Sequence, residues 1–145
     1  MAVADDIGTI REAIKTQLAA QMTDEPTIYA RASSSMNPPC ILIQPRSARG
    51  NSMGRAKKLE YMFSIFILLT KGLDDANWED KIDDFLSPSG DLSIEAALRA
   101  DTTLSGAIEM LDVEGWDSYG DEIVINGIGY AGARFAVRIW GKEPS

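Results

Sequence analysis

The chain lacks histidine and has one cysteine, Cys40. Histidine is the commonest general base and metal ligand in proteins, so its absence excludes Ser-His and Cys-His nucleophilic sites. A lone cysteine can form neither an intrachain disulfide nor, without histidine, a zinc-binding set. The sequence therefore predicts no catalytic, cofactor-binding or metal-binding residues, and it favours a protein that is not an enzyme and is assembled inside a cell.

Long hydrophobic runs and an excess of positive charge are also absent. The most apolar stretch, residues 61–69, is interrupted by Ser64 and falls well below the roughly 20 residues of a membrane helix. The N-terminal residues are acidic and lack the pattern of a secretory signal. With 14 Lys and Arg against 22 Asp and Glu, the net charge of −8 disfavours wrapping nucleic acid over the whole surface. We expect a soluble protein with no membrane partner.

The length and composition fit one globular domain covering residues 1–145. The chain is 45% hydrophobic and 25% charged, close to ordinary globular averages. Apolar residues at helical spacing predict an amphipathic helix over residues 5–21, and short apolar runs predict strands over 27–30 and 40–44, the second ended by Pro45. Alternation over 61–69 predicts a long strand, central because both of its faces become apolar.

The second half of the chain returns to helical spacing before ending in strands. We expect a helix over 74–86, a short helix capped by Ser93 and another short helical segment after Asp101. Residues 110–140 are typical of about three strands, with a hairpin at Asn126-Gly127. The predicted fold class is α+β, a mainly antiparallel β-sheet packed against an N-terminal helix and a central helical segment.

Two apparent motifs have simpler interpretations. Residues 127–132 match the dinucleotide pattern G-x-G-x-x-G, but an alternating strand follows where a helix is needed, so we expect a hairpin. Asp80, Asp83 and Asp84 could share one side of a helix and bind a hard cation, as in a carboxylate-based, metal-dependent enzyme. The favoured interpretation is a solvated helix face.

Opposite charges are concentrated in two segments. Residues 46–58 contain five basic residues and no acid, which indicates a mobile loop, whereas residues 74–86 are acidic. Charge complementarity sets register between partners, so both segments are candidate subunit or partner contacts. The alternatives are contact of the basic loop with passing nucleic acid, or a simple solvated loop tip. The candidate residues are Arg46, Arg49, Arg55, Lys57, Lys58, Asp75, Glu79, Asp80 and Asp83.

The order of segments resembles the tail-terminator proteins of bacteriophages with long, non-contractile tails, also described as minor tail or tail-completion proteins. The resemblance spans most of the chain. It rests on five stretches of sequence: Pro-Pro-Cys-Ile-Leu-Ile at 38–43, Trp-Glu-Asp-Lys-Ile-Asp-Asp-Phe-Leu at 78–86, Gly-Asp-Leu-Ser-Ile-Glu-Ala-Ala-Leu at 90–98, Ala-Leu-Arg-Ala-Asp-Thr-Thr-Leu-Ser-Gly at 97–106 and Tyr-Ala-Gly-Ala-Arg-Phe-Ala-Val at 130–137.

This resemblance implies a structural virion protein without catalytic activity. Such a protein forms a ring of identical subunits, a hexamer, that caps the completed tail tube, ends tube polymerisation and provides the interface for joining to the head. The implied partners are other copies of the chain, the tail tube protein, the head-tail connector or neck protein, and genomic DNA that passes through the lumen without specific binding. The implied location is the head-proximal end of the virion tail, after assembly in the cytoplasm of the host bacterium.

Three other functions remain open at the level of the sequence. A head-closure or other neck protein would share the virion setting but bind the portal side first. A metal-dependent enzyme would use the aspartates of residues 80–84, and a DNA-binding module would use residues 46–58 and bind in a salt-sensitive manner.

Overall fold

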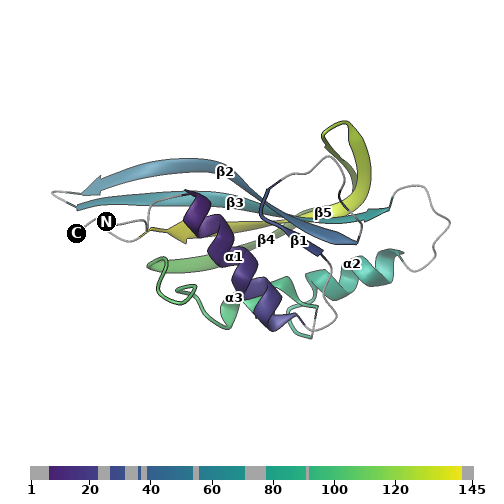
Figure 1. Cartoon of the computed structure of the whole chain (residues 1–145), viewed down its shortest axis with the longest axis horizontal. Helices are drawn as coiled ribbons and strands as arrows, with labels where there is room; N and C mark the ends of the chain where they lie inside the picture. The colour runs from purple at the N-terminus through teal and green to yellow at the C-terminus, as the bar shows by residue number, and fades with distance from the viewer. Residues whose placement is uncertain are drawn as a thin grey trace.

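The computed structural model describes residues 7–22, 27–31, 36, 39–53, 56–70, 78–90 and 92–141. Within this part of the chain the fold is α+β, as the sequence predicts, with helices packed on a mostly antiparallel sheet (Figure 1). The elements in chain order are α1 (Ile7–Gln21), β1 (Thr27–Tyr29), β2 (Cys40–Met53), β3 (Ala56–Thr70), α2 (Trp78–Leu86), α3 (Ile94–Arg99), β4 (Met110–Ile125) and β5 (Ile128–Trp140).

The described strands form one sheet in the order β1-β2-β3-β5-β4. The short β1 runs parallel to β2, and every other neighbouring pair is antiparallel. β3 lies in the middle, so the expectation of a central strand is confirmed. The outermost strands are β1 at one edge and β4 at the other.

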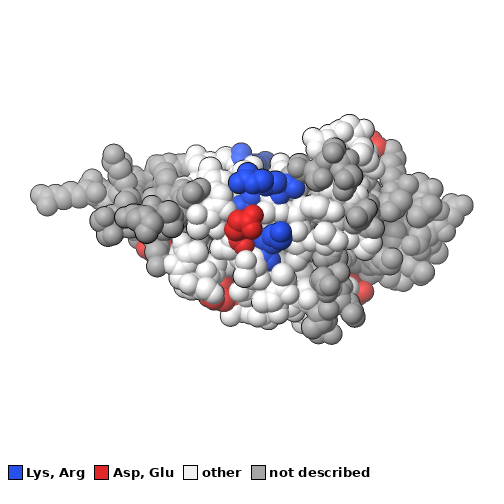
Figure 2. All heavy atoms as spheres, in the orientation of Figure 1, with Lys and Arg blue, Asp and Glu red and all other residues white. Residues whose placement is uncertain are grey.

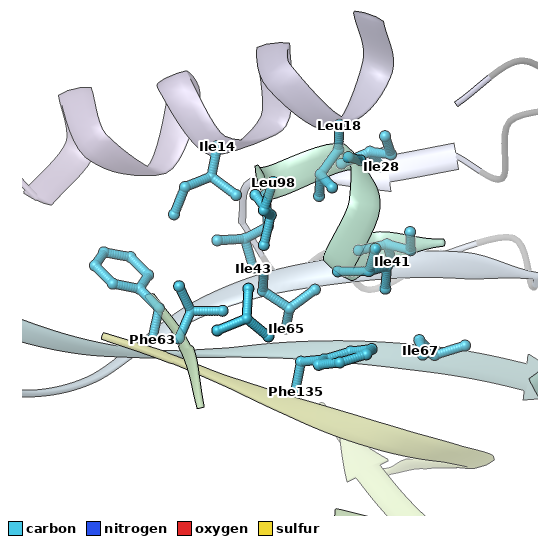
Figure 3. Close-up of a cluster of buried hydrophobic side chains, with 14 of the residues drawn as sticks. Ile14, Leu18, Ile28, Ile41, Ile43, Phe63, Ile65, Ile67, Leu98 and Phe135 are labelled. Carbon is cyan, nitrogen blue, oxygen red and sulfur yellow. The ribbon is translucent and has the colours of Figure 1, made fainter. Parts of the chain in front are cut away.

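The three helices in the described part of the chain pack on one face of the sheet and bury the main core. In Figure 3 the side chains of Ile14 and Leu18 from α1 and Leu98 from α3 point toward the inward residues of the strands. The sheet contributes large, fully buried side chains, of which Phe63 and Phe135 are the largest. The alternation of β3 and β5 explains the placement, because every second residue of a strand faces the helices.

A smaller apolar cluster lies on the other face of the sheet. It contains Met36, Cys40, Leu42, Leu68 and Tyr130, all buried. This cluster explains why the sequence of β3 is apolar on both faces toward its end.

The structure corrects the prediction that Pro45 ends its strand and that a loop follows. β2 continues to Met53 and pairs with β3 down to Met53 opposite Ala56, with a register shift between Pro45 and Ser47. A proline lacks an N–H for the ladder but fits extended backbone, and an irregularity in register accommodates it. The described residues of the basic segment 46–58 therefore lie in two paired strands, β2 and β3, and not in a loop.

Two further predictions are corrected in the second half of the chain. The residues after Asp101 form turns and no helix, because Leu104, Ser105 and Gly106 have φ of 49°, 57° and 87°. Leu104 is nevertheless buried, as is Ile108, in agreement with the expected apolar pattern. Two long strands, β4 and β5, occupy the region where about three were expected, since β4 continues through two register shifts.

The helix and turn signals at two other positions are confirmed. Ser93 is the N-cap of α3, where its hydroxyl oxygen accepts a hydrogen bond from the backbone N–H of Ala96 at 3.0 Å. Asn126 and Gly127 have φ of 51° and 81°, and they join β4 to β5 as a two-residue turn. Positive φ at both positions is the requirement of a type I′ turn.

Candidate interaction surfaces

The basic residues lie along a hairpin that extends beyond the shared sheet. β5 ends at Trp140, which is opposite Glu60 of β3. Within the described residues, the end of the hairpin, where residues 50–53 of β2 pair with residues 56–59 of β3, is therefore two-stranded. Figure 1 shows β2 and β3 extending together past the helices. The side chain of Arg46 is exposed. Arg49, Lys57 and Lys58 lie in the two strands; their side chains and residue Arg55 lie outside the described part.

In the described part of the chain, the acidic helix α2 lies away from the basic hairpin. α2 contacts β3, α3 and β4, and Figure 1 places it toward the end of the sheet opposite to the basic hairpin. Asp83 and Asp84 are exposed, and Asp83 accepts a hydrogen bond of 2.7 Å from the hydroxyl of Tyr119 in β4. The side chains of Glu79 and Asp80, and residue Asp75, lie outside the described part. The exposure of Asp83 and Asp84 agrees with a solvated helix face.

An exposed apolar surface on β4 was not anticipated from the sequence. Four large apolar side chains of this edge strand are exposed, and Ile128 lies just beyond the turn. The rings of Trp116 and Tyr119 have centroids 5.9 Å apart and are tilted by 47°. The irregular register of the strand hides any simple alternation, and only the sheet order shows that β4 is an edge. The four residues are Met110, Trp116, Tyr119 and Val124.

Ion pairs between neighbouring strands cover part of the face away from the helices. Arg134 of β5 donates from Nε to Oδ1 of Asp117 at 3.0 Å and also contacts Oδ2. Arg138 lies between Glu114, at 3.1 Å, and Glu60, at 3.6 Å. The hydrogen bonds from Arg134 hold the pKa of Asp117 below its usual range, and the nearby charge of Arg46 lowers that pKa further. These ion pairs join β5 to β4 and β3 on the same face of the sheet as the smaller apolar cluster.

Charged side chains on the opposite, helix-covered face gather over α1. Figure 2 shows blue and red residues side by side near the middle of this view, surrounded mainly by uncharged surface. The charge on Arg11 of α1 is less favourable than usual, because burial and the charge of Arg31 lower its pKa. The helix-covered face therefore mixes both signs in its described part and presents no single charged patch there.

The glycine-rich segment has the geometry of a hairpin and not of a nucleotide site. Gly127 occupies the turn, and Gly132 lies in β5 where a Cβ atom would be 1.8 Å from the carbonyl oxygen of Ile67. The motif is followed by the rest of β5 and not by the helix that a pyrophosphate site requires. The prediction of a hairpin is confirmed.

Neither a metal site nor a reactive thiol is found in the described part of the chain. No group of three or more His, Cys, Asp or Glu residues is arranged there to hold a metal ion. Cys40 is buried, and burial raises the pKa of its thiol to about 11, which keeps the thiol protonated near neutral pH. Among the described helices, none has the length and apolar character needed to cross a bilayer.

Comparisons with known proteins give no family for the chain. The sequence matches no model of a protein family, and it has no significant match to a curated protein.

Proposed function

We propose that the protein is a structural subunit that assembles head to tail into a ring, and that this ring caps a phage tail tube at its head-proximal end. The ring ends tube polymerisation and offers its other face to the head connector. The observation that carries the ring is the pair of unlike sheet edges, a long acidic β4 with exposed apolar residues and a basic β2. The assignment of this ring to a tail tube rests on the resemblance of the sequence to tail-terminator proteins.

A head-to-tail ring requires two different, complementary surfaces on each subunit. A two-fold dimer uses one patch on both partners, whereas a ring repeats one contact between unlike patches until rotation closes it. The edges at β2 and β4 differ in charge and in apolar exposure. They meet this requirement without a second protein.

No reaction is part of this proposal, and genomic DNA passes through the ring without specific binding. The net charge of −8 suits this role, because like charge limits adhesion of the phosphate backbone. Dense Lys and Arg on the lumen in an electron-microscopy map of the ring would contradict this part of the proposal.

The assembly state tests the ring. Native mass spectrometry and negative-stain imaging of one sample, at low and moderate salt and with and without magnesium, should give six-subunit rings with a central hole. Two-fold dimers as the largest species, with tail tubes present or absent, would refute it.

A binding assay tests the tail position. Purified tail tubes and filled heads, incubated separately with labelled protein, should show label at one end of each tube and none on the heads. Label on heads alone would instead indicate a head-closure or other neck protein.

The basic hairpin favours DNA binding as a second candidate function. Residues 46–58 contain five basic residues and no acid, and their described part lies in the paired strands β2 and β3, so this segment could contact a phosphate backbone. Binding would then weaken steeply with salt and be lost on charge reversal at Arg46 and Arg49. Fluorescence anisotropy with a DNA duplex at increasing salt measures both.

A further inference from the structure

The two edges of the sheet leave long stretches of strand without a neighbour in the described part of the chain. β1 covers the outer side of β2 only from Cys40 to Leu42, so residues 43–53 have no described strand beyond them. β4 is the last strand on the other side. Open strand edges present unpaired N–H and C=O groups and are templates for pairing with another chain.

Strand direction makes these two edges compatible with each other. Each step from β2 through β3 and β5 to β4 is antiparallel, so β4 runs opposite to β2. When a second copy in a similar orientation places its β4 beside β2, the antiparallel order continues without a break. Sheet twist rotates each strand relative to the last, which lets such a continued sheet curve around an axis.

The register brings opposite charges to the same level of the two edges. Ser47 of β2 is opposite Met62, Met62 is opposite Arg138, and Arg138 is opposite Asp112 of β4. In an unstaggered neighbour Asp112 therefore lies level with Ser47, beside Arg46. Two residues further along β2, Arg49 is level with Met110 by the same chain of pairs.

Charge and exposure at these positions suit a contact between copies. β4 contains five acidic residues and no basic ones, whereas β2 contains two arginines and no acid. The side chain of Asp112 is 47% exposed, and its ion-pair partner, Arg99, is 3.9 Å away. Arg46 is exposed, and Met110 is 45% exposed at the same edge. Opposite charges directly across neighbouring strands stabilise pairing, and burial of Met110 adds to it.

We infer that β4 of one copy pairs antiparallel with the open part of β2 of the next copy, with Asp112 beside Arg46, so that one sheet continues from subunit to subunit. This inference rests on the proposed head-to-tail assembly and identifies its contact. The partner at this edge is a second copy of the chain.

A charge swap between copies tests the contact. One variant carries Arg46→Glu with Arg49→Glu, and the other carries Asp112→Lys. Each alone places like charges at every contact, so assembly should need about tenfold more protein than the wild type. An equal mixture should assemble as well as the wild type, because every contact in an alternating ring then joins opposite charges.

Native mass spectrometry measures the result, since the variants differ in mass and alternating rings contain three copies of each. Circular dichroism confirms that each variant is folded. The control Arg46→Lys with Arg49→Lys keeps both charges and should assemble normally. Asp84→Lys reverses an exposed charge on α2 and should also leave assembly unchanged.

The outcomes separate this inference from the function on which it rests. Rings that form equally well in the wild type and in both charge-reversed variants would overturn the β2–β4 contact and leave the proposed ring intact. Weakened assembly of the variants without rescue in the mixture would also overturn it. A wild-type protein that remains monomeric at high concentration, with tail tubes present or absent, would overturn both.

Discussion

The β2–β3 and β4–β5 hairpins extend beyond the shared sheet in different ways. The β4–β5 hairpin closes through Asn126 and Gly127 at positive φ; its Tyr130 belongs to the smaller apolar cluster, and Ile123 and Ile125 pack against that cluster. The β2–β3 hairpin extends past Glu60 as a basic two-stranded ribbon beyond the end of β5.

This difference shows that the same secondary structure can be stabilised from different sources. The β4–β5 hairpin combines a favourable local turn with side-chain packing. The β2–β3 hairpin depends on the long strand β3, which is held between β2 and β5 from Glu60 to Leu68. A two-stranded ribbon alone is marginal in water, so anchoring by the body of the sheet is required.

Loss of the core packing that anchors β3 in the sheet should reduce the stability of the protein most. Phe63→Ala removes a fully buried ring from β3, and we expect about 3–5 kcal/mol less stability because a cavity replaces the ring. Urea unfolding followed by circular dichroism measures the loss. Phe66→Ala, half-buried on the opposite face, is the matched control and should cost less; an equal loss would argue against the helix-covered core as the main anchor.

The pairing of β3 with β5 should be nearly as sensitive. Gly132→Val places a Cβ atom against the carbonyl oxygen of Ile67, so the strands must separate, and we expect about 3 kcal/mol of destabilisation. Thermal and urea unfolding test this expectation. Ala136→Val, on the same strand and face, should change stability by about 0.5 kcal/mol or less. If the two variants were equally stable, the close approach at Gly132 would be unimportant.

The turn of the β4–β5 hairpin should make a smaller contribution to stability, confined to the region of the turn. Gly127→Ala has space for its methyl group but must adopt φ of 81°, which costs about 1 kcal/mol for an L-residue. Hydrogen exchange should show the loss near the turn, with protection of the β2–β3 amides unchanged. Global loss of protection would show that the turn supports both hairpins.

The exposed ion pair between β4 and β5 should have the smallest effect and a defined pH dependence. Hydrogen bonds from Arg134 lower the pKa of the Asp117 carboxyl in the folded state. The charge of Asp117 therefore stabilises the fold above the unfolded pKa of about 3.9, and this contribution is lost as pH falls through the folded pKa. Because the Asp117 side chain is 52% exposed, Asp117→Asn should cost only about 0.5 kcal/mol at pH 7. Urea unfolding of both proteins should converge at acidic pH; a constant difference would point to a steric effect.

Local sequence signals predict the elements whose determinants are close together in the chain. The apolar spacing of α1, the N-cap at Ser93, the alternation of β3 and the turn at Asn126 each depend on a few neighbouring residues, and the structure confirms them. Of the charged candidate contact residues, Arg46 and Asp83 are exposed.

Long-range pairing explains most of what local signals missed. Pro45 and the glycines of 46–58 indicate a loop, but thirteen of the fourteen residues of β2 pair along β3 and override that preference. The turns after Asp101 have a more local cause, because the Asp101 carboxylate accepts hydrogen bonds from the backbone N–H groups of Thr103 and Ser105 and competes with a helix.

The sequence by itself determined the fold class, the amphipathic faces, the β4–β5 turn and the absence of histidine chemistry, because these follow from residue type and short spacing. Only the tertiary structure decided that β4 is an edge, that the basic segment is a hairpin and that Asp112 lies level with Ser47. Those features depend on which strands become neighbours, and strand order is fixed by burial of the whole sheet against its helices and not by any one segment.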